Sequence, residues 1–314
     1  MTSIKPRENL ATLFEGVRTK SIAARSSATR RAYSYDWTTF VTWAESHRRA
    51  ALPASQKTVA AYIVQLDKNG LSNATIARTL ASISTAHKLG GLATPTTSAL
   101  VRDTFRGIKR EKTFHRRKAS PITLDHLGRL LEYCDNTSIG LRDRALVLVG
   151  WAAALRRSEI VLLDVGDIEE HPEGIAVVIR RSKTDQEQDG VKIGLPFADG
   201  PLCPVRALRA WLAHAEISEG PIFRSIYKGG KIAPRRLSDQ RVNAIVKRLA
   251  AAAGYNPDSY SGHSLRSGFA TSAAKVGCEE RDIMRHTRHR SIATAREYIR
   301  EGSLFENPLS TLLK

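Results

Sequence analysis

Residues 261–270 read SGHSLRSGFA, and together with HRSIATAREY at 289–298 they carry the strongest indication of fold and chemistry. His263 and Arg266 lie three residues apart at the start of a predicted helix over Ser264–Val276, so both side chains fall on one face. The positive end of that helix favours an anion. A capping histidine and a surface arginine would give the same spacing, so this pair alone leaves both explanations open.

Three other patterns contain candidate reactive side chains. In WAAALRRSEI at 151–160, Arg156 and Glu159 are three residues apart near a helix end, as a surface ion pair would also be. Lys183 lies in the turn of a predicted hairpin, where a solvated lysine is the ordinary expectation. His289 precedes Tyr298 by nine residues, and a tyrosine there is equally compatible with a core position.

Taken together, these side chains match the needs of phosphoryl transfer. Two arginines, a lysine and two histidines can hold a phosphate and neutralise its charge, and a tyrosine supplies an oxygen nucleophile. No carboxylate cluster suggests Mg²⁺, and no glycine-rich GKS or GKT loop suggests a nucleotide. A zinc site built from His263, His286 and His289 is disfavoured because arginines surround it. We therefore expect no cofactor and no metal.

The order Arg-x-x-Glu, hairpin Lys, His-x-x-Arg, His and, nine residues later, Tyr resembles the tyrosine recombinase family of phage integrases, Xer proteins and Cre. SGHSLRSGFA and IATAREYIR are especially similar to its Cre-like or Xer-like branch. The resemblance covers nearly the whole chain. It implies a site-specific DNA recombinase that cleaves and rejoins DNA through a 3′-phosphotyrosine intermediate. Strands would be exchanged between two target sites through a Holliday junction.

The resemblance also implies a role for each catalytic position. Arg156 and Arg266 would hold the scissile phosphate, and Lys183 would protonate the departing 5′ oxygen. Tyr298 would be the nucleophile. Because the family keeps the bond energy in the phosphotyrosine, the resemblance implies that rejoining needs neither ATP nor a metal ion.

The remaining positions include one departure from the family pattern. His263 would bond the phosphate and assist proton movement at the tyrosine, and His289 would bond a non-bridging oxygen. Glu159 is expected to orient Arg156. The family usually carries Leu-Gly before the second histidine, whereas this chain has Thr287-Arg288, which leaves the shape of that loop open.

Length and composition set limits on the remaining classes of protein. The 314 residues favour two domains, and 42% hydrophobic residues exclude a mostly disordered chain. The sequence has no apolar stretch long enough for a membrane span, and MTSIKPRENLATLF is not a secretory signal. Three cysteines lie far apart in no metal-type spacing. A reduced cytoplasmic, nucleoid-associated protein is predicted.

The charge is large and uneven. The net charge is +18, and residues 1–120 carry 21 basic against 7 acidic side chains. This asymmetry indicates a polyanion partner such as nucleic acid. The family resemblance implies that this partner is double-stranded DNA with an inverted-repeat target site. Ribosome association would also give a basic chain, but would not require the six ordered residues above.

The expected fold is mainly α with a small antiparallel β-sheet, in two domains. Periodicity predicts a four-helix bundle and then a domain with strands and further helices. The family resemblance implies that these are the core-binding and catalytic domains. The predicted segments are 1–26 (flexible N-terminus), 27–112 (all-α DNA-binding domain), 113–120 (linker) and 121–314 (catalytic domain with a C-terminal tail helix). The predicted bundle helices are Ser27–Arg49, Lys57–Lys68, Asn73–Leu89 and Ser98–Lys112. The predicted strands are Ile160–Ile168, Gly174–Arg181 and Val191–Leu195.

One aromatic stripe in the bundle needs a choice between core and DNA. Tyr33, Trp37 and Phe40 recur at helical spacing, which favours packing over a base-stacking platform. The candidates for DNA contact are instead polar and basic side chains that the patterns leave on the surface. They are Asn73, Arg78, Arg235, Arg236, Gln240 and Arg241.

The resemblance further implies how the two domains and several copies of the chain work together. The domains would form a clamp on opposite faces of the duplex. The chain would be a monomer or weak oligomer when free and a homotetramer on two DNA sites, with the tail Ser303–Lys314 packing on the next protomer.

Two alternative functions remain. One is a non-catalytic DNA-binding regulator on a recombinase scaffold, which would not need Tyr298 and both arginines. The other is a telomere resolvase or a topoisomerase-like strand transferase, whose chains usually carry larger added domains.

Overall fold

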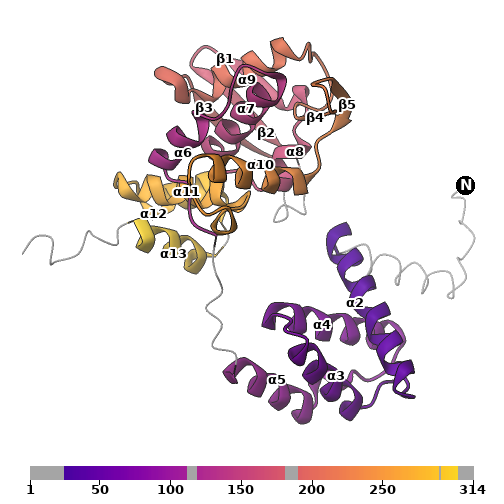
Figure 1. Cartoon of the computed structure of the whole chain (residues 1–314). Helices are drawn as coiled ribbons and strands as arrows, with labels where there is room; N and C mark the ends of the chain where they lie inside the picture. Colours follow the sequence, from indigo (N-terminus) through magenta and orange to yellow (C-terminus); the bar gives the residue numbers. More distant parts are fainter. Residues whose placement is uncertain (1–24, 112–118, 181–189, 290, 303–314) are drawn as a thin grey trace, which may run out of the picture. The chain divides into compact units, whose positions relative to one another are not determined.

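The computed structural model describes residues 25–111, 119–180, 190–289 and 291–302. The chain divides into two compact units, Met1–Arg116 and Arg117–Lys314 (Figure 1). Lys183 and the predicted tail Ser303–Lys314 lie outside the described residues, as do nearly all of the segment 1–26 and most of the linker 113–120.

Helices make up the described part of the first unit. They are α2 (Ser27–Ser46), α3 (Gln56–Lys68), α4 (Asn73–Leu89) and α5 (Ala99–Glu111), with the short 3₁₀ turn η1 (Pro95–Thr97). The first three each begin after a serine whose hydroxyl oxygen accepts the backbone N–H of a threonine three residues on. This is a strong N-terminal signal, so the predicted helices agree within one or two residues at these starts.

The core of this unit contains the predicted stripe. Phe40 is fully buried, and its ring centroid lies 5.0 Å from that of Tyr62 on α3. Trp43 packs on the other side of Tyr62 at 4.8 Å, whereas Tyr35, off the stripe, is 71% exposed. Trp37 packs against the same core, so the prediction that the stripe forms core is confirmed for Trp37 and Phe40. The first helix is shorter than predicted, because Arg48 takes a left-handed φ of 53° just after it ends.

The second unit combines helices with two small sheets. The helices are α6 (Leu124–Leu131), α7 (Ser138–Ala152), α8 (Arg157–Leu162), α9 (Pro204–His214), α10 (Asp239–Ala252), α11 (His263–Lys275), α12 (Glu280–Thr287) and α13 (Ile292–Gly302). The 3₁₀ turns are η2 (Val165–Asp167), η3 (Gly200–Leu202) and η4 (Pro257–Ser259). The strands are β1 (Ile168–His171), β2 (Gly174–Ile179), β3 (Val191–Pro196), β4 (Arg224–Ile226) and β5 (Ile232–Arg236).

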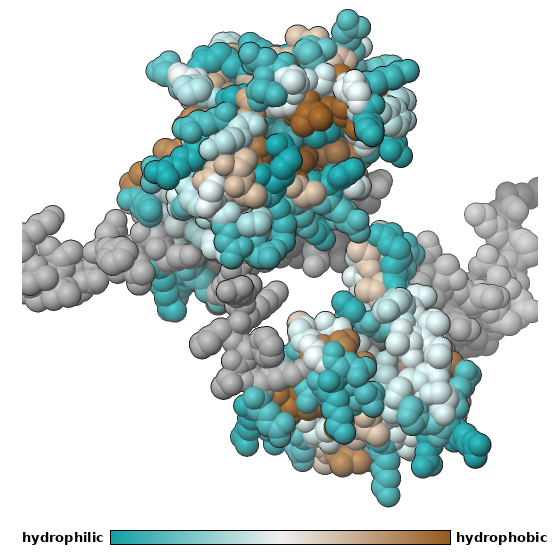
Figure 2. Space-filling model, viewed as in Figure 1, coloured by the Kyte–Doolittle hydropathy of each residue, from teal (hydrophilic) through white to brown (hydrophobic). Residues whose placement is uncertain are grey.

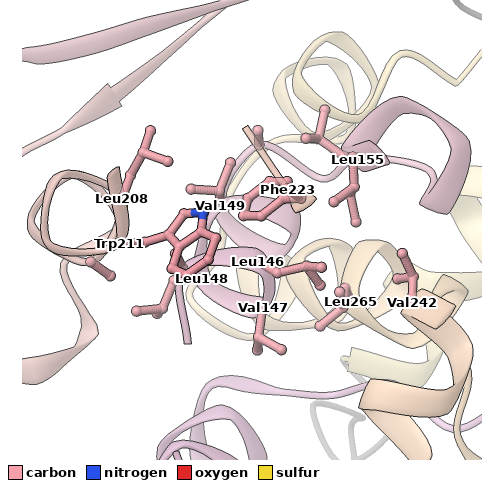
Figure 3. Packing of buried hydrophobic residues seen from close by; sticks show 14 of the residues in the cluster. Leu146, Val147, Leu148, Val149, Leu155, Leu208, Trp211, Phe223, Val242 and Leu265 are labelled. Atoms are coloured by element: carbon pink, nitrogen blue, oxygen red, sulfur yellow. The ribbon is translucent and has the colours of Figure 1, made fainter. Parts of the chain in front are cut away.

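Helix α7 lies at the centre of this unit and is surrounded by other elements of the fold. Its residues Leu146 to Val149 are all buried, so it packs against other elements around its whole circumference. Figure 3 shows these side chains between Trp211 of α9 on one side and Leu265 of α11 on the other. Trp211 is fully buried, and its indole N–H donates to Ile222 O at 2.9 Å. A helix held in this way delivers its C-terminal turn to a fixed place.

The three-stranded sheet is antiparallel with the order β1-β2-β3, and Val177 pairs with Ile168 and with Ile193. The predicted strand Ile160–Ile168 is wrong over most of its length. Helix α8 runs through Leu162, and only Ile168 belongs to a strand. The side chain of Glu159 accepts the Arg156 N–H and closes the first turn of α8. That local contact outweighs the strand preference of the β-branched residues that follow.

One hairpin was not anticipated from the sequence. Strands β4 and β5 pair across a turn that contains Gly229 and Gly230, whose φ angles are 97° and 88°. Both glycines adopt a backbone that other residues rarely take, and this dipeptide was the available signal.

The observed architecture confirms the fold class, mainly α with small antiparallel sheets. Figure 2 shows hydrophilic side chains over most of the face in view, with apolar residues in small groups. Among the described residues, no helix has the length and apolar character that crossing a membrane requires.

Gly268 generates a test of this packing. A Cβ on it would lie 1.9 Å from the carbonyl oxygen of Ile122, which already accepts the Trp151 indole N–H at 2.7 Å. Gly268→Ala is therefore expected to lower the free energy of unfolding by roughly 1–3 kcal/mol in urea titrations. Gly128→Ala is the control, because nothing lies within 4 Å of its position in α6. A Gly268→Ala protein as stable as the original would contradict this packing.

Candidate active site

The turn between α7 and α8 places Arg156 and Glu159. Arg156 is the N-cap of α8, and Glu159 accepts both its backbone N–H at 2.9 Å and its Nη1 at 2.6 Å. The Glu159 side chain is only 2% exposed, so this is not a surface ion pair. Burial raises the pKa of that carboxyl, but Arg288 and the contacts from Arg156 outweigh it and hold the pKa below its usual value.

Arg266 lies one turn into α11 and is 1% exposed, so the alternative of a surface arginine is wrong. Its Nη1 donates to Ala154 O at 2.8 Å, and its Nε reaches His289 Nε2 at 3.5 Å. Its Nη2 is buried and has no hydrogen-bond partner among the described residues. A buried donor left unpaired is costly, and an oxyanion is the partner that would satisfy it.

The electrostatic environment of Arg266 also favours an anion. Burial, with Arg156 and Arg288 close by, lowers the pKa of Arg266 to about 9. Arg156 and Arg288 pair directly with the carboxylate of Glu159, and Arg266 lies within the electrostatic influence of all three groups. A phosphate would relieve the repulsion between them.

His289 follows the end of α12, and its tautomer can be assigned from its neighbours. The Thr287 hydroxyl donates to Ile283 O at 2.6 Å, so its oxygen accepts from His289 Nδ1 at 2.8 Å. The Nε2 atom is then an acceptor that faces Arg266. Burial and the charges of Arg266 and Arg156 lower the pKa of His289 to about 4, so this ring is neutral at pH 7.

Tyr298, on α13, brings the last two predicted residues into the cluster. Its hydroxyl lies 2.7 Å from His263 Nε2. Its ring stacks on His289 with centroids 5.6 Å apart. The structure thus connects five of the six predicted catalytic residues, Arg156, His263, Arg266, His289 and Tyr298, through direct contacts or through shared partners. The sixth, Lys183, lies in the segment 181–189, outside the described residues.

His286 does not join this cluster. Its Nε2 donates to Ala152 O at 2.7 Å, and its ring stacks on Phe269 at 4.2 Å. Within the described ranges, no three His, Cys, Asp or Glu side chains are grouped so as to hold a metal ion.

The predicted DNA-contact residues fall into two groups. Arg78 pairs with the buried Asp36 through two hydrogen bonds, at 2.8 and 2.9 Å. Arg236 donates to Val161 O, to Leu163 O and to Asp164 Oδ1. These two guanidinium groups are therefore engaged within their own units.

The other four candidates are placed differently. Arg235 lies over the ring of Tyr227 at 5.6 Å, and Arg241 is exposed in the first turns of α10, as is Gln240. Arg235 and Arg241 line a hollow of about 250 Å³. Asn73 is the first residue of α4, and its Oδ1 is buried without a hydrogen-bond partner in the described part of the chain.

Sequence reasoning assigned no role to Arg288, although it noted the departure Thr287-Arg288. The backbone of Arg288 is left-handed, with φ 56° and ψ 42°, at the C-cap of α12. The shape of the loop, left open by the sequence, is therefore the one that a glycine would have allowed. The sequence did mark this position, because it has an arginine where the family pattern has glycine.

The lowered pKa of His289 predicts a loss of stability in acid. Between its native pKa of about 4 and the ordinary value near 6.5, the unfolded chain binds the extra proton, so the free energy of unfolding falls as pH falls. His289→Gln is expected to remove up to about 2 kcal/mol of the loss between pH 7 and pH 5. Urea titrations at the two pH values measure it. An unchanged acid sensitivity in His289→Gln would contradict the assignment of a neutral, buried ring.

Comparisons with known proteins identify the family of this chain. Residues 121–303 match the phage integrase family, and residues 20–89 match the phage integrase N-terminal SAM-like domain. An integrase/recombinase XerD homologue of Selenomonas ruminantium is 38% identical over 289 residues, covering 90% of this chain and 84% of the relative. The Cre recombinase of Escherichia phage P1 is 25% identical over 319 residues, covering 95% and 90%.

Solved structures show the same fold. A XerH recombinase bound to a palindromic difH substrate has a TM-score of 0.61 at 17% identity, covering 93% of this chain and 84% of that one. A lambda integrase dimer bound to a core site has a TM-score of 0.60 at 17% identity, covering 92% and 77%. On the sequence matches, the chain belongs to the phage integrase family of tyrosine recombinases, enzymes of site-specific DNA recombination.

Proposed function

We propose that Tyr298 is the nucleophile of this recombinase and that Arg156, Arg266, His263 and His289 surround the scissile phosphate. The observation that carries the proposal is the Tyr298 hydroxyl, 2.7 Å from His263 Nε2 in a cluster that also holds the buried Arg266. The Arg266 Nη2 group, which has no hydrogen-bond partner in the described ranges, supplies a reason for an anion to bind there.

The proposed step is a displacement at phosphorus. The Tyr298 oxygen forms a bond to the phosphorus, the bond to the 5′ oxygen breaks, and a 3′-phosphotyrosine remains. The tyrosine proton passes toward His263, and the 5′ oxygen leaves with a proton from Lys183, which lies outside the described residues. The reverse reaction with a 5′ hydroxyl of the other duplex joins the exchanged strands through a Holliday junction.

Electrostatics supports this chemistry. The phosphate gains negative charge in the transition state, when both entering and leaving oxygens are partly bonded. Three guanidinium groups against one carboxylate leave an excess of positive charge, which favours that state over the singly charged diester. His289 beside them is neutral and its Nε2 accepts from Arg266 Nε, so it orients that guanidinium and adds no fixed charge.

The DNA substrate of this proposal is a duplex with an inverted-repeat site. The two structural relatives named above were solved on DNA, one of them after cleavage. Strand exchange between two sites needs four active centres, so the proposed assembly is a homotetramer on two sites, and a monomer or weak oligomer without DNA. The proposal also places the chain where the DNA is, in the cytoplasm with the nucleoid.

Covalent capture tests the nucleophile. The protein is incubated with fragmented genomic DNA of its source in EDTA, stopped with SDS, and the attached DNA is sequenced. Adducts at one inverted-repeat site are expected for the original chain and for Tyr133→Phe, an exposed tyrosine of the same unit, and none for Tyr298→Phe. Adducts that persist in Tyr298→Phe would overturn the assignment.

The remaining outcomes separate the alternatives. Specific binding without any adduct would favour the non-catalytic regulator. Adducts at many unrelated sequences would favour topoisomerase-like strand transfer. Activity in EDTA is the outcome expected from a mechanism without a metal.

Salt dependence tests the DNA contacts proposed for the exposed side chains. Arg235→Ala and Arg241→Ala are each expected to reduce the slope of log affinity against log salt concentration by about one, because each removes a phosphate contact. Arg236→Ala should instead lower stability, since its guanidinium bonds Asp164 and two carbonyl groups. Fluorescence anisotropy on the captured site, at salt concentrations from 50 to 200 mM, distinguishes these results. A slope unchanged in both variants would remove them from the interface.

A further inference from the structure

Arg288 has a backbone conformation that its residue type does not favour. It is the C-cap of α12, with φ 56° and ψ 42°, in the left-handed region where glycine is the usual residue. An L side chain is strained there, and such strain persists when the surrounding structure holds the residue in place. The contacts of its side chain show what does so.

The guanidinium of Arg288 is buried and reaches across to the α7–α8 turn. The side chain is 6% exposed, and its Nη2 donates to Glu159 Oε2 at 2.9 Å and to Ala154 O at 3.1 Å. Its Nη1 donates to Ala153 O at 3.2 Å and to His286 O at 3.1 Å. The carbonyl groups just past the end of α7 have no hydrogen-bond partner inside that helix, and the Arg288 side chain donates to them instead.

These contacts join the parts of the active site that come from distant segments. Glu159 uses its other bonds on Arg156, and Arg266 donates to the same Ala154 carbonyl that Arg288 binds. His289 is the next residue after Arg288. Three of the proposed catalytic side chains are therefore positioned relative to one buried turn through Arg288.

Arg288 also affects how tightly Glu159 holds Arg156. Within the described part of the chain, Arg156 gives Glu159 only Nη1 from its guanidinium, while Arg288 supplies the second cation to that carboxylate. If Arg288 were absent, Arg156 would be the one arginine among the described residues still in contact with the carboxylate. It would then be held more tightly by Glu159 and be less available to a phosphate.

We propose that Arg288 is a positioning residue of the active site, which holds the His289 loop against the Arg156–Glu159 turn and shares the charge of Glu159. The inference rests on the function proposed above. It assigns a role to a position where the family pattern has glycine. In this chain the residue there has a strained left-handed backbone and forms a buried ion pair.

The first test compares variants of Arg288 on the captured DNA site. Arg288→Ala and Arg288→Gly are expected to bind DNA as the original chain does, but to form the adduct up to about 100-fold more slowly at saturating DNA, because small misplacements of catalytic groups slow a reaction by that factor. Arg288→Lys should recover part of the rate. Arg285→Ala is the matched control, because this arginine of α12 is 75% exposed and pairs with Asp282.

The glycine variant is decisive for the kinetic test. Glycine relieves the left-handed strain, so Arg288→Gly would match or exceed the original rate if the side chain had no positioning role. An original rate in Arg288→Gly, with Tyr298→Phe inactive, would overturn the proposal.

A second measurement does not depend on cleavage. In the DNA-free protein, ¹³C NMR of the Glu159 carboxyl is expected to show its pKa rise by at least about one unit in Arg288→Ala and stay unchanged in Arg285→Ala, because the nearby cation is lost only in the former. No adduct from the original chain would refute the proposed function, while this titration would still test the ion pair. An unmoved Glu159 pKa would overturn the inference.

A double variant tests the proposal if the single variants misfold. Removing one cation can destabilise a buried carboxylate, so Glu159→Gln combined with Arg288→Ala removes that carboxylate together with the cation, while Arg156, which is 22% exposed, keeps its charge. The combined variant should fold and still form the adduct slowly, because the contact that positions Arg156 is missing. Adduct formation at the original rate would count against the proposal.

Discussion

The carboxylate of Glu159 accepts hydrogen bonds from the backbone and guanidinium of Arg156 and from Arg288, in a place that solvent barely reaches. A buried charge is tolerated only when such partners surround it. The contacts that pair this carboxylate determine where α8 begins and where Arg156 lies. The contact from Arg288 holds the loop after α12 close to them. The remaining groups of the site are arranged around that anchor.

The site is also incomplete in a way that suits an anion. Arg266 is almost fully buried, one of its nitrogens has no hydrogen-bond partner in the part of the chain that the structure describes, and its pKa is lowered by burial and by the neighbouring arginines. A protein can hold such a group because α7 is buried all round and presents the Ala154 carbonyl to it at a fixed place. A phosphate would supply the missing acceptor and the missing charge together. The unpaired nitrogen of Arg266 lowers the stability of the DNA-free protein, and substrate binding restores it.

Much of this could be predicted from the sequence, and the failures have identifiable causes. Helical periodicity predicted α3 and α4 because that signal is local. The strand predicted over Ile160–Ile168 failed because the buried Glu159 closes a helical turn there. Arg236 looked like a surface cation, yet it bonds Val161 and Asp164, more than 70 residues away along the chain. Contacts over such separations leave no local pattern.

The sequence by itself determined the residue types of the site, their order along the chain and the basic character of the first 120 residues, since these are properties of single positions and of composition. Only the tertiary structure decided that Arg266 is buried, that His289 is neutral and that Arg288 accepts a strained backbone to reach Glu159. Burial and electrostatic environment depend on groups that folding brings together, and the energy of each contact exists only once its distant partner is in place.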